Sequence, residues 1–336
     1  MILFVKDLTV IDFSYLCKDR GPLGESWIVD LEMHGDLNDE SMVLDFSLVK
    51  KQVKRIIDDV IDHKLAIATR GDAVISEAGE QTNVSFSFGE HQLAVSSPHQ
   101  AFCLIDTDKI NETSVKGFLE QTILPQLPSN VSKIVLKLRP EHTNGFYYHY
   151  SHGLKKHDGN CQRIAHGHRS KIHIYQNGQR SAELETAWSL RWKDIYLASE
   201  ADRIALADIE LSANATENLS ADQQLFSYFA PQGRFDIAVP SNILDVVDCD
   251  STVELLADFI LRQLKQQSPD NEFKVVAFEA QSGEGLIAQK LGLQDRMIAE
   301  RQGISLRTVQ NKLLSFYDKL GVEDATDGDT PINKRV

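Results

Sequence analysis

The chain repeats part of its own sequence, and this repeat limits its fold more than any other feature does. Three pairs of similar segments carry it: Phe13-Ser14-Tyr15-Leu16 with Tyr150-Ser151-His152-Gly153-Leu154, Thr113-Ser114-Val115 with Thr252-Val253-Glu254, and Lys133-Ile134-Val135-Leu136 with Lys274-Val275-Val276-Ala277. The members of these pairs are 137, 139 and 141 residues apart, respectively. Nearly constant spacing at three separate places indicates a duplicated unit. We therefore predict two homologous halves, residues 1–141 and 142–285, and a C-terminal segment at 286–336.

Composition narrows the class of protein. A chain of 336 residues has room for about two domains. The net charge of −14 repels phosphate backbones and disfavours general nucleic-acid binding. Apolar stretches fall short of the roughly 20 residues of a membrane helix, and the first residues turn charged too soon for a signal peptide. Four scattered cysteines without a CxxC pair suit a reducing compartment, so we expect a cytoplasmic protein with no membrane partner.

Local patterns predict strands with helices between them. Residues 27–31 and 171–175 are short, rich in β-forming side chains and partly alternating, which is typical of strands. Apolar residues recur at helical spacing over residues 47–59, with Ser47 as a suitable N-cap, and again over residues 252–264. Antiparallel hairpins with helices laid on one face form an α+β domain, and we expect that class for each half.

Three histidines of the second half form a candidate metal site. His166 and His168 are two residues apart, so on a strand their side chains project from the same face. His152 lies on the preceding expected strand, residues 146–154, which can pair with theirs as a hairpin. Three histidine ligands with a fourth position open are typical of catalytic rather than structural zinc. The alternative is three unrelated histidines on solvated strands, and the His-x-His pattern alone does not exclude it.

Cys161 and Glu279 strengthen the metal interpretation. Cys161 lies in a polar loop five residues before His166, where a thiol near a dication can act as a base or a nucleophile. Its alternative role is that of a small buried hydrophobe. Glu279 ends a β-like run, where a carboxylate can accept two hydrogen bonds from the planar N–H edge of an amino-pyrimidinone. Its alternative role is that of a surface glutamate.

Together these residues resemble the 6-pyruvoyl-tetrahydropterin synthase and 6-carboxy-tetrahydropterin synthase family. The second half has the family's motifs in order: His152 in an aromatic strand, the loop residue Cys161, His166-Gly167-His168, the helix start at Thr252 and the terminal Glu279. The first half resembles the same family in its middle segment, residues 42–65. The resemblance thus covers about residues 1–285.

The resemblance implies a fold, a cofactor and an activity. The fold is the tunnelling fold, a four-stranded antiparallel sheet with two helices per unit, whose units assemble into barrels as homo-oligomers. Zn²⁺ would be held by the three histidines, Cys161 would be the general base, and Glu279 and Thr252 would bind the pterin. The family removes or cleaves the side chain of dihydroneopterin triphosphate to give a tetrahydropterin, in tetrahydropterin or queuosine biosynthesis. We therefore expect a zinc-dependent lyase of pterin metabolism.

The two halves depart from the family pattern in complementary ways. In the first half Tyr15 replaces the first histidine and Leu23-Gly24-Glu25 replaces His-Gly-His, so this half is expected to bind no zinc. The second half lacks the family's Asp-His pair, which the first half keeps as Asp62-His63. We hypothesise one composite site, in which Asp62 orients His63 as a proton relay toward Cys161. The alternative is that the first half is a structural remnant.

The C-terminal segment lies outside that family. Residues 297–313 have the pattern of a helix, a glycine turn and a second helix, and they resemble the helix-turn-helix of bacterial response-regulator and quorum-sensing activators. Six basic and three acidic residues give residues 286–322 a charge of +3, so any contact with nucleic acid is expected through this segment. The alternative is an αα-hairpin that covers a sheet or mediates assembly.

Two other functions stay open beside the enzyme. One is a pterin-sensing or DNA-binding regulator with a non-catalytic core, which the helix-turn-helix pattern favours. The other is a purely structural partner subunit. The intact set of three histidines, a cysteine and a glutamate favours the enzyme.

Overall fold

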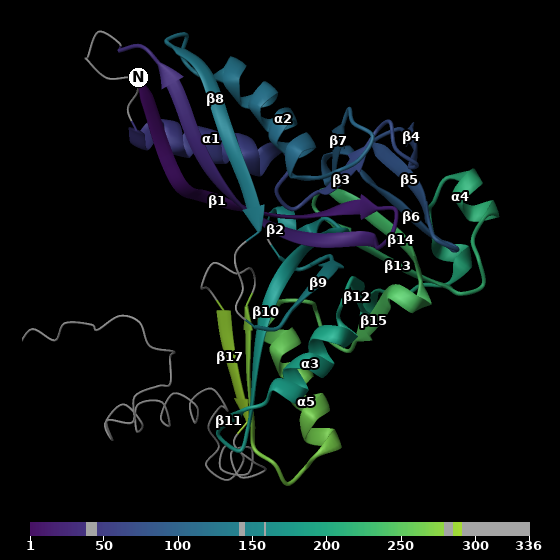
Figure 1. Ribbon diagram of the computed structural model, residues 1–336. Helices are drawn as coiled ribbons and strands as arrows, with labels where there is room; N and C mark the ends of the chain where they lie inside the picture. The colour runs from purple at the N-terminus through teal and green to yellow at the C-terminus, as the bar shows by residue number, and fades with distance from the viewer. Residues whose placement is uncertain (38–45, 141–144, 158, 279–284, 291–336) are drawn as a thin grey trace, which may run out of the picture.

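The computed structural model describes residues 1–37, 46–140, 145–157, 159–278 and 285–290. They form an α+β protein with three sheets, drawn in Figure 1. No helix within these ranges is long and apolar enough to cross a membrane.

The first half is built on a long hairpin. Its elements are β1 (Ile2–Cys17), β2 (Gly21–Gly35), α1 (Phe46–Val60), β3 (Leu65–Ala68), β7 (Phe102–Ile105), α2 (Glu112–Ile123) and β8 (Val131–Pro140). The strands form a sheet in the order β7-β3-β1-β2-β8. Helices α1 and α2 lie along one face of this sheet (Figure 1). The core lies between them, because buried side chains such as Phe13 and Leu31 of the hairpin pack with Val53 and Leu119 of the helices.

The second half has the same sequence of elements. They are β9 (Tyr147–His152), β10 (His166–Gln176), α3 (Ala182–Arg191), β12 (Ile195–Ser199), β15 (Leu244–Val247), α5 (Val253–Gln267) and β16 (Phe273–Phe278). Their order in the sheet, β15-β12-β9-β10-β16, matches that of the first half strand for strand. Two further strands, β11 (Gln179–Arg180) and β17 (Gly285–Lys290), pair with β10 and β16 respectively. Trp192, Ile260 and Leu264 belong to the core between this sheet and its helices.

A third sheet joins the two halves. The first half contributes β4 (Val74–Ala78), β5 (Gln81–Phe88) and β6 (His91–Pro98), and the second contributes β13 (Gln223–Ala230) and β14 (Gly233–Pro240). Strands β6 and β14 pair antiparallel, with Val95 opposite Ile237, so the order is β13-β14-β6-β5-β4. The short helix α4 (Ala213–Glu217) follows β12 and precedes β13. Neither half completes this sheet alone.

The long hairpins of the two halves also meet directly. Ser14 and Ser151, which the repeat equates, are joined by a hydrogen bond of 2.7 Å between their Oγ atoms. Gly24 of β2 and Gly167 of β10 lie back to back there, since a Cβ on Gly167 would come within 2.7 Å of the Gly24 Cα. Only glycine permits such close approach of two backbones.

Several sequence predictions need correction. The four-stranded antiparallel sheet is wrong, because each hairpin sheet also contains two parallel pairings: β3 with β1 and β7, and β12 with β9 and β15. Each parallel strand follows a crossover that contains a helix or the third-sheet hairpin, which local patterns do not reveal. Helix α1 begins at Phe46, so Ser47 lies inside it.

The helix caps and the C-terminal boundary also differ in detail. Asn111 caps α2, and Thr252 caps α5 instead of being its first residue, so the counterpart of Thr252 is Asn111 rather than Thr113. Strand β17 extends the second sheet beyond residue 285, where the tail was expected to begin. The rest of that tail, including the helix-turn-helix pattern, lies outside the described residues.

Candidate metal and catalytic site

The three predicted metal ligands converge in one buried cluster. His152 of β9 is the direct partner of His166 in the antiparallel ladder with β10, and His168 follows two residues later on the same face. One ring nitrogen from each imidazole lies within 4.8 Å of the others. The Nε2 atoms of His152 and His168 are 3.1 Å apart, and all three side chains are almost completely buried.

The opposite ring nitrogens face groups outside the cluster, and those of His152 and His166 are hydrogen-bonded to them. His152 Nδ1 lies 2.8 Å from the Ser251 Oγ, and His166 Nδ1 donates to the Arg163 carbonyl oxygen at 2.8 Å. His168 Nδ1 lies 3.3 Å from Asp12 Oδ1, at ion-pair distance but not aligned as a hydrogen bond. Anchoring one nitrogen of a histidine by an outer partner is how proteins direct the other nitrogen at a metal.

The chemistry of this cluster fits a metal ion. His166 Nε2 is buried and has no hydrogen-bond partner, and a buried polar atom without a partner is costly. Burial, and then the charge of neighbouring imidazoles, hold the pKa of His152 and of His166 well below the usual range. Both rings are therefore neutral at physiological pH, the form that binds metals. Three buried imidazoles with a free position match Zn²⁺ best.

The Asp62-His63 pair of the first half reaches this cluster. His63 follows α1 in a turn with a positive φ of 54°, which directs its ring toward the second half. Asp62 Oδ2 lies 2.6 Å from His63 Nδ1, and Asp62 Oδ1 accepts a hydrogen bond from the Asp12 backbone N–H at 2.9 Å. The His63 backbone N–H in turn donates to the Asp12 carbonyl oxygen at 2.7 Å. The imidazole is thus fixed at both its backbone and its ring.

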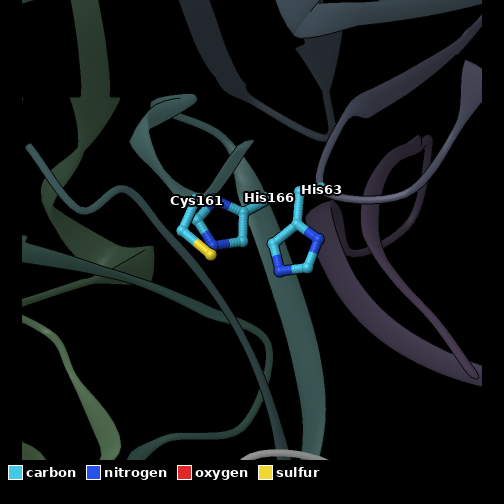
Figure 2. A group of neighbouring side chains, drawn as sticks. All are labelled: His63, Cys161 and His166. Carbon is cyan, nitrogen blue, oxygen red and sulfur yellow. The ribbon is translucent and has the colours of Figure 1, made fainter. Parts of the chain in front are cut away.

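Cys161 completes the composite cluster. The side chains of His63, Cys161 and His166 face one another in Figure 2, and one ligand atom from each lies within 4.8 Å of the other two. Burial on its own would lower the pKa of His63, but the Asp62 carboxylate and Cys161 outweigh it and raise that pKa to about 11. All four cysteines are free, so Cys161 is available as a thiol.

The remaining predicted residues have different outcomes. Thr252 is the N-cap of α5, and its hydroxyl accepts from the Leu255 N–H at 3.3 Å. Its neighbour Ser251 makes the contact with His152. Glu279 lies outside the described residues. The sequence did not identify Ser251 or Asp12 as residues that contact the histidine cluster. Each directly precedes a repeated segment, since Asp12 is followed by Phe13 and Ser251 by Thr252.

The corresponding positions of the first half lack the imidazole set. Tyr15, Leu23 and Glu25 stand there, and Glu25 Oε1 lies 2.8 Å from Nδ1 of His149 in the second half. Glu25 also accepts a hydrogen bond from Trp27 Nε1. A carboxylate with two partners of its own occupies the place of a metal ligand.

Comparisons with known proteins give matches to part of this chain. Residues 141–285 match the family model of 6-pyruvoyl tetrahydropterin synthase. A putative 6-carboxy-5,6,7,8-tetrahydropterin synthase of Pyrococcus horikoshii is 23% identical over 128 residues, which are 38% of this chain and 74% of that protein.

Solved structures of 6-pyruvoyltetrahydropterin synthase from two Plasmodium species also align. The Plasmodium vivax enzyme is 16% identical, and the Plasmodium falciparum enzyme is 12% identical. Each alignment covers 41% of this chain and 97% of the other, with a TM-score of 0.33. On the family match, the second half of this chain contains a domain of the 6-pyruvoyl tetrahydropterin synthase family, at residues 141–285.

Proposed function

We propose that the chain is a zinc-dependent lyase of pterin metabolism. The observation that carries this proposal is the convergence of three buried imidazoles on one point beside Cys161 and the Asp62-His63 pair. The family match over residues 141–285 supports the substrate class. The proposed substrate resembles dihydroneopterin triphosphate, and the product is a tetrahydropterin that enters tetrahydropterin or queuosine biosynthesis.

The residues of the site would divide the work between the halves. His152, His166 and His168 would hold Zn²⁺, which supplies Lewis acidity to the oxygens of the substrate side chain and so acidifies the neighbouring C–H bonds. Cys161 would take a proton from that side chain as general base. His63 lies within reach of the sulfur and would pass the proton on, while Asp62 holds its ring in place. Thr252 and Glu279 would bind the pterin ring.

We also propose that the two halves are tandem tunnelling-fold units and that copies of the chain assemble. The matching strand order of the two hairpin sheets supports the tandem arrangement. At the start of β1, Ile2 and Phe4 are 60% and 66% exposed, an apolar surface that assembly would cover. Sedimentation velocity measures the assembly, and a single-chain mass at micromolar concentration contradicts it.

Metal content and turnover test the proposed activity together. We expect the purified chain to carry one zinc per chain and to convert dihydroneopterin triphosphate to a tetrahydropterin, detected by chromatography. Substituting His166→Ala removes a ligand and should abolish both zinc retention and turnover. His157→Ala is the matched control, because His157 is exposed in the same half and lies outside the cluster.

Two results would contradict the proposal. One is full zinc retention in the His152→Ala, His166→Ala and His168→Ala variants. The other is a zinc-loaded protein that leaves every dihydroneopterin derivative unchanged. Zinc-free protein that retards a promoter fragment would instead favour the regulator.

A further inference from the structure

Asp12 occupies a junction between the two parts of the composite site. It lies on β1, in the first half, opposite Ser26 of β2. Its backbone N–H donates to the Asp62 carboxylate and its carbonyl accepts from the His63 N–H, at 2.9 Å and 2.7 Å. One residue of the first half therefore positions both members of the Asp62-His63 pair through its backbone.

The side chain of the same residue points at the other part of the site. Asp12 Oδ1 lies 3.3 Å from Nδ1 of His168, the nitrogen opposite the one that faces the imidazole cluster. The carboxylate is held in this direction by a hydrogen bond from the Ser26 hydroxyl. Ser26 is itself fixed, because its Oγ accepts from the Arg169 backbone N–H at 3.1 Å. The Asp12 side chain is 16% exposed and His168 is 2% exposed, so water screens the contact weakly.

We infer that Asp12 is a positioning residue for the metal, acting through His168 from the opposite half of the chain. This inference rests on the proposed function. With Nε2 directed at a cation, the proton of His168 resides on Nδ1, where the Asp12 carboxylate can accept it. A carboxylate in this place fixes the ring orientation and raises the basicity of the ligating nitrogen. Asp12 of β1 thus contacts both His168 of the proposed metal site and the Asp62-His63 pair.

Within the described ranges there is also a matched contact whose side chains belong to no cluster of possible metal ligands. Glu25 and His149 form a buried carboxylate–imidazole pair between the same two halves, at 2.8 Å. If Asp12 merely joined the halves, removing either carboxylate would have the same consequences. A positioning role predicts that only Asp12 affects metal binding.

The test compares Asp12→Asn with Glu25→Gln in the full-length protein. Zinc affinity is measured by competition with a chromophoric chelator, and thermal unfolding of the zinc-free protein is measured in parallel. We expect Asp12→Asn to weaken zinc binding by about 10- to 100-fold and Glu25→Gln to leave it unchanged. The backbone bonds to Asp62 and His63 do not involve the substituted atoms. The absorption spectrum of Co²⁺-loaded protein should also change in Asp12→Asn and not in the control.

A double-mutant cycle of Asp12 and His168 distinguishes an effect transmitted through His168 from a general effect on folding. In a His168→Ala background, Asp12→Asn should cause no additional loss of zinc affinity. Ser26→Ala keeps the carboxylate but removes the hydroxyl that orients it, and should weaken zinc binding several-fold if Asp12→Asn does not fold. If both Asp12→Asn and Ser26→Ala bind zinc with wild-type affinity, the inference about Asp12 is wrong, but the proposed function is unaffected. A wild-type chain without zinc affinity overturns the proposed function as well.

Discussion

At the scale of single residues, two different acid–imidazole pairs lie at the contact between the halves. On one side Asp62 holds His63 beside Cys161, next to three imidazoles whose outward nitrogens all have partners or close contacts. On the other side Glu25 holds His149, and the ligand positions carry Tyr15 and Leu23. The contact between the halves thus contains both a site that fits a metal and a carboxylate–imidazole pair that belongs to no such cluster among the described residues.

Replacing His63 tests whether proton transfer depends on the first half. Because a positioned acid–base group contributes about 10²- to 10⁴-fold to a rate, His63→Ala should lower kcat by that order. Zinc content should stay at the wild-type level, since His63 is not among the three predicted ligands. Steady-state turnover and elemental analysis measure the two quantities. Wild-type turnover in this variant would exclude the relay.

At the scale of elements, the site depends on how closely the β1–β2 and β9–β10 hairpins approach. Ser14 bonds to Ser151 at the crossing, and His149 Nδ1 lies 2.8 Å from the Gly24 carbonyl oxygen. Gly24 and Gly167 let the backbones meet, which brings Asp12 and His63 within reach of the second half. The spacing of the hairpins therefore sets the geometry between Asp12 of β1 and His168 of β10.

A methyl group on Gly24 should push the hairpins apart. Its Cβ would overlap the Tyr150 carbonyl oxygen, a backbone atom that cannot move aside by a change of rotamer. We expect Gly24→Ala to destabilise the protein by about 1–3 kcal/mol and to reduce turnover more than the loss of folded protein explains. Chemical unfolding and activity assays at low temperature measure the two effects.

Gly117→Ala provides the control for this substitution. Gly117 lies in α2, where an added Cβ would meet nothing within 4 Å, so alanine should raise stability by about 0.5–1 kcal/mol. Equal stability changes for the two variants would show that the close approach at Gly24 is unimportant.

At the scale of the whole molecule, the two halves share structure that neither has alone. Strands β6 and β14 pair across the boundary, and the cluster of buried side chains around the third sheet draws Phe86 and Leu93 from one half and Phe226 and Phe235 from the other. The composite site uses residues of both halves in the same way. We therefore expect that each half needs the other in order to fold and to form the site.

Separating the halves should therefore remove the site. We expect residues 142–336, expressed alone, to lose turnover and most zinc affinity, because Asp12 and His63 are missing and an edge of β14 is exposed. Co-expression with residues 1–141 should restore a one-to-one complex with both properties, measured by light scattering and metal analysis. An active second half on its own would contradict this view.

The sequence revealed those parts of the molecule that depend on local periodicity. The alternation around His166 and the spacing to His152 predicted the hairpin and the shared face, and the structure places both residues opposite each other. The third sheet escaped prediction because the partner of Val95 is Ile237, and pairing between such distant strands leaves no local pattern. The role of Asp12 was not predicted because two of its hydrogen bonds, to Asp62 and His63, are made by backbone atoms that every residue type possesses.

The hydrogen bond between Ser14 and Ser151 has a consequence for how this molecule can change over generations. In an assembly of identical chains, a substitution at such a contact appears on both sides at once, so each partner must tolerate it. Here the two serines belong to separate codons of one gene, and either can mutate while the other is retained. The same independence extends to Glu25 and His168, which allows one half to specialise in holding a ligand while the other specialises in supporting it.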